Sequence, residues 1–142
     1  MPVKQLSKFP KYSLYLVADK FNSLNERQQE ALNLTNFKNP FVTLALGLFL
    51  GVIGADRFYI GSIGIGALKA LALFFIFAAI GIIEAVYEGK AMSDNEYIVA
   101  LGIAGLVLMF YFVLAVVDAF LSFKACKEKN LQTLVEILEI YK

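Results

Sequence analysis

Three long apolar runs, separated by two polar connections, constrain this chain more than any other feature of its sequence. The runs lie at about residues 40–60, 63–87 and 97–123, and each approaches or exceeds the roughly 20 residues that an α-helix needs to cross a bilayer. A soluble fold would spread its apolar residues through amphipathic elements and carry about 25% charged residues. Here 59% of the 142 residues are hydrophobic and 18% are charged. We therefore predict an all-α integral membrane helical bundle with three spans.

The first run is the shortest of the three. Asn39-Pro40 is a good helix start, because Asn can cap a helix and Pro at the first helical position loses no needed hydrogen bond. The 15 residues from Phe41 to Ala55 span about 22 Å as a helix. A full crossing therefore requires the helix to continue toward Ile60 or the bilayer to become thinner around it. In an alternative topology, one of the three runs, which the sequence does not single out, is re-entrant: it enters the membrane and returns to the same side.

The polar N-terminal segment, residues 1–39, predicts a helical hairpin. Residues 23–26 read Ser-Leu-Asn-Glu, a capping-box pattern that predicts a short helix at about 24–33. Before it, apolar residues recur at spacings of three and four, as on one face of a second short helix: Leu14, Val17, Phe21 and Leu24. We expect this hairpin to lie at the membrane interface or to bind a partner.

The C-terminal segment, residues 124–142, predicts an amphipathic helix. Its apolar positions recur with helical spacing: Leu131, Leu134, Val135, Leu138 and Ile140. A short helix of this kind lies on a membrane surface or on a partner. The membrane domain between the two terminal segments is predicted to cover residues 40–123.

Composition excludes several classes of chemistry. The chain has no His and one Cys, Cys126, so His-based catalysis, His-containing zinc sites and an intrachain disulfide cannot be built. We expect no metal and no cofactor. The net charge of +1 gives no reason to expect nucleic-acid binding. The basic segment and short apolar core of a signal peptide are missing before Phe41, so we expect the first run to remain in the mature protein.

Whether the charges beside the spans indicate an orientation in the membrane depends on the number of crossings. With three spans, Arg27, Lys38 and Lys90 lie on one side and Arg57 lies with the basic cluster at 124–129 on the other, so the positive-inside rule does not choose an orientation. A re-entrant run would put both basic terminal segments in the cytoplasm. That arrangement agrees better with the rule.

Four charged residues within or beside the runs form the candidate site: Asp56, Arg57, Lys69 and Asp118. Charges at such depths are costly unless they are paired or solvated. With three spans, Asp56, Lys69 and Asp118 fall at similar depths below one surface, which predicts a partly buried network that orients the helices. Arg57 can join the network or bind a lipid phosphate. An ion or proton path is the alternative use of these residues.

Glycine spacing predicts a close helix contact in the first run. Gly47, Gly51 and Gly54 form a stripe of small residues along which another helix can approach. Three further glycines precede Lys69: Gly61, Gly64 and Gly66. This segment lacks the Gly-Lys-Ser/Thr sequence of a phosphate-binding loop. A tight interhelical turn is the better interpretation of these later glycines.

The residues from Gly47 to Gly61, which include Asp56-Arg57-Phe58-Tyr59 and are followed by residues 64–69 with Lys69, resemble the TM-2 domain family. This family is named for its two transmembrane helices and carries an Asp-Arg-Phe motif. Residues 116–118, Val-Val-Asp, are similar to the family's apolar-apolar-Asp element late in its second helix. The segment from 71 to 111 is longer than the family's, which suggests an inserted third span. The resemblance implies a membrane architecture of the bacterial type and names no activity.

These observations lead to a functional expectation. We expect a non-enzymatic, multi-pass scaffold or interaction protein in the cell membrane, specifically the bacterial inner membrane. Its expected partners are the lipid bilayer and a second copy of the chain or another membrane protein. A small oligomeric channel or transporter is the alternative. An intramembrane aspartyl protease built on Asp56 and Asp118 is a remote one, because Lys69 would compete for the two carboxylates.

Overall fold

A computed structural model describes residues 7–15, 19–20 and 23–140, and within these residues the structure is helical without strands. The all-α prediction is confirmed there. The elements follow in this order: η1 Lys11–Ser13, α3 Glu26–Leu34, α4 Pro40–Leu50, η2 Gly51–Ile53, α5 Ala55–Tyr59, α6 Ile63–Glu88 and α7 Asp94–Ile140.

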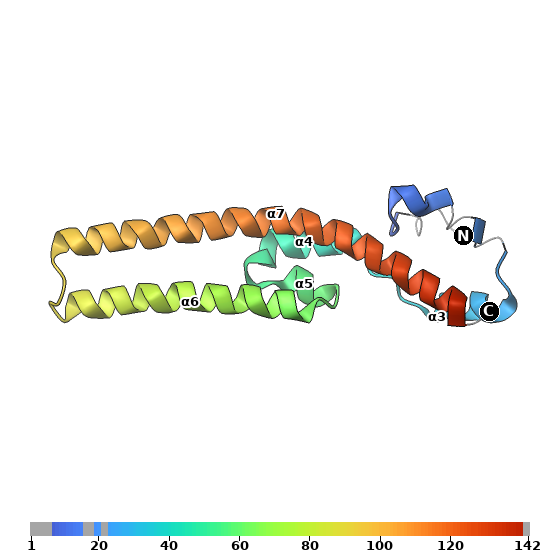
Figure 1. Cartoon of the computed structure of the whole chain (residues 1–142), viewed down its shortest axis with the longest axis horizontal. Helices are drawn as coiled ribbons and strands as arrows, with labels where there is room; N and C mark the ends of the chain where they lie inside the picture. Colours follow the sequence, from blue (N-terminus) through green and yellow to red (C-terminus); the bar gives the residue numbers. More distant parts are fainter. Residues whose placement is uncertain (1–6, 16–18, 21–22, 141–142) are drawn as a thin grey trace.

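Two of the described helices, α6 and α7, are long and apolar enough to cross a membrane. They have 26 and 47 residues, or about 39 and 70 Å, and they run side by side in opposite directions (Figure 1). Large apolar side chains along them are exposed, including Phe74 and Phe110. Helices of this kind fit a lipid environment, because the core helix of a soluble protein would be mostly buried.

A short capped loop joins α6 to α7. Tyr87 and Tyr97 stack with ring centroids 4.0 Å apart, and the Tyr87 hydroxyl donates to Asp94 at 3.0 Å. Ser93 lies immediately before α7. Its backbone N–H donates to the Glu96 carboxylate at 2.9 Å, which is one of the two hydrogen bonds of a capping box. The loop therefore closes the far end of the hairpin with aromatic side chains, as is common at a membrane interface.

The first apolar run does not cross, so the prediction of three spans is wrong. Helix α4 has 11 residues, about 16 Å, after which η2 reverses the chain and α5 returns toward the end where α4 began (Figure 1). The re-entrant alternative, which did not specify the run, applies to the first run. The segment from 71 to 111, which suggested an inserted span, instead lengthens α6 and α7.

Gly54 makes the reversal between η2 and α5 possible. Its φ of +80° lies in the left-handed region, which residues with a Cβ adopt only at a cost in free energy. A Cβ there would also lie 2.7 Å from the carbonyl oxygen of Gly66 on α6. The Gly54 N–H donates to Gly51 and its carbonyl accepts from Arg57, both at 3.0 Å, so the turn satisfies its own backbone groups.

Helix α4 packs closely against α7 through its glycines. A Cβ at Gly47 would lie 2.6 Å from the Cβ of Ala119, and one at Gly51 would lie 3.6 Å from the carbonyl oxygen of Ala115. Of the three glycines in the predicted stripe, Gly47 and Gly51 thus face α7, whereas Gly54 faces α6.

The C-terminal segment is the end of α7 and not a separate surface helix, which corrects the expectation for residues 124–142. Its apolar face meets the N-terminal segment in a small core whose buried members are Phe9, Leu32, Phe37 and Leu134. The rings of Phe9 and Phe37 lie 5.1 Å apart. We call residues 7–15, 19–20 and 23–39 together with 124–140 the terminal platform. It lies beyond the α5–α6 end of the hairpin (Figure 1).

Asn130 on α7 ties the two parts of the terminal platform together. Its side-chain amide donates to the carbonyl oxygens of Lys8 at 3.0 Å and Lys38 at 2.8 Å. Its side-chain oxygen accepts from the Lys38 N–H at 3.1 Å. A single buried amide thereby satisfies three backbone groups of the N-terminal segment.

Helix α3 begins two residues later than the capping-box pattern predicted. Asn25 is the N-cap: its side chain accepts from the Gln28 N–H at 2.8 Å, and the Gln28 side chain accepts from the Asn25 N–H at 3.1 Å. The predicted Ser23–Glu26 box is therefore wrong, and Ser23 donates instead to the Lys20 carbonyl. Val17 and Phe21, which belong to the other predicted helix, lie outside the described residues.

Candidate functional site

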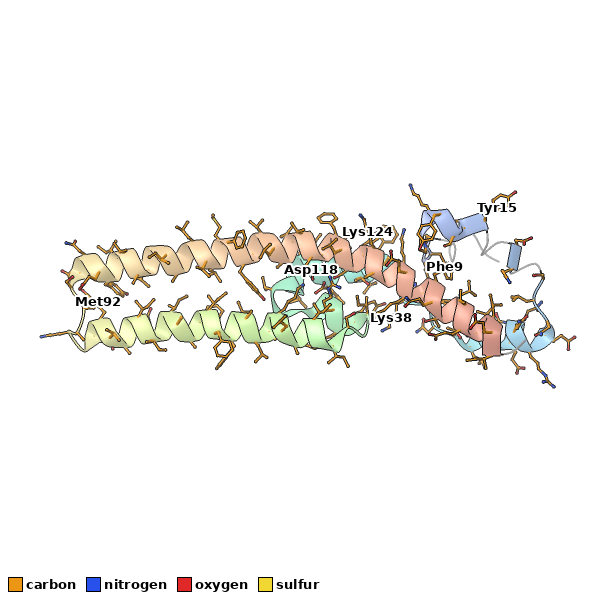
Figure 2. The ribbon with its side chains drawn as sticks, viewed as in Figure 1. Phe9, Tyr15, Lys38, Met92, Asp118 and Lys124 are labelled. Atoms are coloured by element: carbon orange, nitrogen blue, oxygen red, sulfur yellow. The ribbon has the colours of Figure 1, made fainter. Side chains whose placement is uncertain are left out.

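Three helices bring the candidate charges together near the platform end of the hairpin. Helix α5 supplies Asp56 and Arg57, α6 supplies Lys69, and α7 supplies Asp118. Lys69 lies six residues inside α6, about 9 Å along the helix axis. The re-entrant turn covers this position, so the four side chains meet inside protein rather than in lipid; Figure 2 labels Asp118 at this level.

Asp56 is the innermost member of the cluster, with a side chain that is 0% exposed. Its Oδ1 lies 3.3 Å from Lys69 Nζ, and its Oδ2 accepts a hydrogen bond from the Ser122 hydroxyl. Arg57 Nε lies 3.9 Å from the same Oδ2. The carboxylate is therefore stabilised by a cation on each side and by a hydroxyl from α7.

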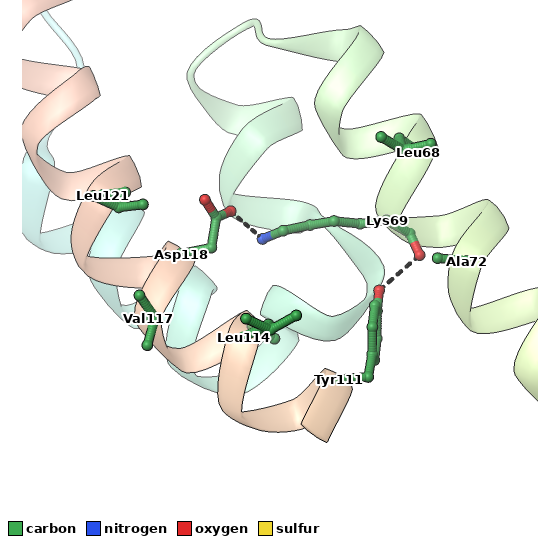
Figure 3. Close-up of a pocket in the computed structure, with 9 residues that line it drawn as sticks. Leu68, Lys69, Ala72, Tyr111, Leu114, Val117, Asp118 and Leu121 are labelled. Atoms are coloured by element: carbon green, nitrogen blue, oxygen red, sulfur yellow. Dashed lines mark hydrogen bonds and ion pairs between the residues drawn. The ribbon is translucent and has the colours of Figure 1, made fainter. Parts of the chain in front are cut away.

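Asp118 is held by two cations. Arg57 makes a bidentate pair with it, through Nε at 2.9 Å from Oδ2 and through Nη2 to Oδ1. Lys69 Nζ reaches across from α6 to within 2.5 Å of Asp118 Oδ2 (Figure 3). Lys69 thus bridges both carboxylates. Two cations and two anions balance, which is the condition for burying charges at this depth.

Tyr111 joins the turn to both long helices. Its hydroxyl oxygen lies 2.7 Å from the carbonyl oxygens of Val52 in η2 and Lys69 in α6, and Figure 3 shows its approach to Lys69. One hydroxyl proton serves one of these acceptors at a time. Irregular backbone at membrane depth is tolerated where protein satisfies it, and Tyr111 does this for the tip of the re-entrant segment.

The Asp-Arg-Phe-Tyr turn divides its side chains between the cluster and the helix packing. Phe58 lies against α6, where a Cβ at Gly66 would be 3.0 Å from its ring. The Tyr59 hydroxyl accepts from the N–H of Asn39, just before α4, at 3.2 Å. Gly61 has a φ of +78° and makes the turn into α6. The motif therefore fixes the re-entrant hairpin on both sides.

A cavity of about 390 Å³ lies between α6 and α7 beside the cluster. Lys69, Tyr111 and Asp118 contribute its polar groups (Figure 3). Its remaining lining residues are apolar: Leu68, Ala72, Leu114, Ala115, Val117 and Leu121. Within the described residues, the cavity included, no group of three or more Asp, Glu or Cys side chains is arranged to hold a metal ion.

Sequence reasoning named Asp56, Arg57, Lys69 and Asp118 but missed Ser122 and Tyr111. Ser122 follows Asp118 by four residues and Tyr111 precedes it by seven, spacings that return to the same face of a helix. This periodicity was the available signal. It is weak by itself, because neutral hydroxyl groups are common in membrane helices.

Comparison with known families identifies one region of the chain. The family model of the TM2 domain matches residues 36–86, which confirms the suspected family for this part of the chain. The match covers α4, the turn, α5 and nearly all of α6. Asp118 and α7 lie beyond it. No curated protein and no solved structure matches the chain at a significant level.

Proposed function

We propose that this chain, which matches the TM2 domain over residues 36–86, is a non-enzymatic membrane scaffold whose terminal platform binds a partner protein. The observation that carries the proposal is the continuity of α7. This helix runs unbroken over 47 residues from the far loop, past the charge cluster, into the platform core. A partner bound to the platform is thereby joined rigidly to the membrane hairpin.

The pairing within the cluster supports a structural role for its charges. An aspartyl protease needs two carboxylates that share a proton. Here Lys69 lies between Asp56 and Asp118, and Arg57 engages Asp118 through two nitrogens. A cation thus occupies the position between the two carboxylates. The arrangement suits a clamp that holds α5, α6 and α7 in register.

The terminal platform presents apolar side chains to its surroundings. Tyr15 is 91% exposed, Leu34 is 81% exposed and Tyr12 is 73% exposed. Tyr side chains are enriched where proteins bind one another, because they combine an apolar ring with a polar tip. These residues are the contact positions that we propose for a partner.

The proposal includes a location and an oligomeric state. We infer a multi-pass protein of the bacterial inner membrane, on the strength of the resemblance to the bacterial type of TM2 domain. We also infer that one partner is a second copy of the chain. A cross-linked product of twice the chain mass would support this second part.

Photo-cross-linking in membranes tests the partner surface. A photoreactive amino acid at Tyr15 or Leu34 should give a discrete adduct, and one at Lys90, which is exposed at the opposite end, should not. Adducts of equal yield at all three positions would overturn the proposal, because the platform would then have no preference over an unrelated surface.

The cavity beside Lys69 and Asp118 is the observation that favours a channel or transporter instead. Purified protein in proteoliposomes distinguishes the two functions. A scaffold should give ion flux no greater than empty liposomes under an imposed gradient. Sustained, ion-selective flux that Asp118→Asn abolishes would replace the scaffold with the channel.

A further inference from the structure

The two ends of the hairpin carry opposite charge. Around the platform end, residues 36–41, 59–62 and 122–130 include four lysines and one carboxylate. Around the far loop, residues 83–97 include four carboxylates and one lysine, Lys90. The re-entrant path of α4 and α5 creates this asymmetry, because it brings Lys38 to the same end as the lysines of α7.

Three of the four lysines at the platform end form what we call the basic collar: Lys38, Lys124 and Lys127. Lys38 Nζ lies 5.8 Å from the ring centroid of Tyr59, and Lys127 Nζ lies 4.7 Å from that of Phe123. The fourth, Lys129, is used within the fold, where it donates to the Ile60 carbonyl and the Ser62 hydroxyl.

The length of α7 fits a position of the basic collar at the depth of lipid headgroups. Figure 2 shows Lys38 and Lys124 near the turn between α5 and α6. Phe41 and Phe123, with centroids 5.5 Å apart, lie at this level as interfacial aromatics do. From Tyr97 to Phe123 the α7 helix covers 27 residues, about 40 Å, which matches a hydrocarbon core with part of its headgroup regions.

We propose that the basic collar binds the phosphate groups of anionic phospholipids and that the platform end faces the cytoplasm. An ammonium group stacked on an aromatic ring still directs N–H donors away from the ring, where a phosphate can accept them. Each such lysine strengthens attraction to an anionic leaflet about fivefold. The excess of lysines at one end gives the orientation by the positive-inside rule. This inference does not depend on the scaffold function.

Lipid titration followed by native mass spectrometry tests the basic collar. Wild-type protein in detergent should bind phosphatidylglycerol with a lower Kd than phosphatidylcholine. The Lys124→Gln, Lys127→Gln variant should raise the Kd for phosphatidylglycerol about tenfold or more and leave that for phosphatidylcholine unchanged. The matched control is Lys20→Gln, Arg27→Gln, which removes the same charge from exposed platform positions and should stay within about twofold of wild type.

Further arms separate charge from fold and lipid from free anion. Lys124→Arg, Lys127→Arg should retain the preference, and higher ionic strength should weaken it in the wild type. Inorganic phosphate should not displace the lipid. The proposal is overturned if the Gln variant keeps its preference, if the control loses it equally, or if inorganic phosphate competes fully.

Orientation has its own experiment in bacterial cells. A phosphatase that is active only outside the cytoplasm should be inactive when fused at the C-terminus of the chain. The same phosphatase inserted after Lys90 in the far loop should be active. The reverse pattern would overturn the cytoplasmic assignment of the platform end.

Discussion

At the scale of single residues, Lys69 links the two carboxylates of the charge cluster from α6, because its Nζ contacts both Asp56 and Asp118. Replacing it with Met should leave a fully buried carboxylate without its closest cation and lower the free energy of unfolding by about 3–5 kcal/mol. Reversible unfolding in detergent measures this loss.

A double-mutant cycle distinguishes a coupled cluster from separate contacts. Asp56→Asn combined with Lys69→Met should cost less than the sum of the two single changes, because the double variant leaves no unpaired charge between them. The same holds for Asp118→Asn with Lys69→Met. Additive losses in both cycles would contradict the geometry of the cluster.

Tyr111→Phe is a second test at this scale. Removing the hydroxyl leaves the Val52 carbonyl at the tip of the turn without the donor at 2.7 Å, which should cost about 1–3 kcal/mol of unfolding free energy. Tyr87→Phe is the matched control, since its hydroxyl bond to Asp94 is exposed and water can replace it. Equal effects of the two changes would show that burial at Tyr111 has no energetic consequence.

Residue positions were predictable where charge made them costly. Asp56, Lys69 and Asp118 fall at similar depths in their runs, so the need to pair intramembrane charges was enough to suggest that they meet. Ser122, Tyr111 and Asn130 are neutral. A neutral side chain does not require a charged partner, so their residue types gave no reason to pair them. Their roles depend on backbone carbonyls and carboxylates that come near only in the folded structure.

At the scale of elements, hydropathy indicated which segments are apolar but not which way the chain turns. Helices α6 and α7 were predictable because unbroken apolar length leaves a helix few alternatives. The first run contained the signals for reversal, in Gly51, Gly54 and the charges that follow. Those signals also fit a helix end at the far interface, so sequence alone left both paths open.

Gly54→Ala tests the element that distinguishes the two paths. The new Cβ would meet the Gly66 carbonyl at 2.7 Å and force an L-residue to a φ of +80°, so we expect a loss of at least about 2 kcal/mol in unfolding free energy. Gly64→Ala is the control, because a Cβ there has nothing within 4 Å. It should leave stability unchanged or raised by up to about 1 kcal/mol. Equal stability of both variants would argue against the re-entrant turn.

At the scale of the whole molecule, the unpredicted feature is that the two terminal segments form one structure. Phe37 and Leu134 share a core, although three spans would have put them on opposite sides of the membrane. Their contact therefore depends on the re-entrant path. A local change in one turn, centred on Gly54, decides whether the platform can exist.

The same dependence predicts from which side of the membrane each part of the chain can be labelled. Single Cys residues at Asn36 and Glu128, both exposed in the platform, should react with a membrane-impermeant maleimide from the same side of sealed, oriented vesicles. A Cys at Lys90 in the far loop should react only from the other side. The native Cys126 is buried and is replaced by Ala to remove its background.

Two spans require this pattern, because α6 and α7 each cross once and return the chain to its starting side. Labelling of positions 36 and 128 from opposite sides would restore a third crossing, separate the two halves of the platform core and remove the structural basis of the proposed scaffold.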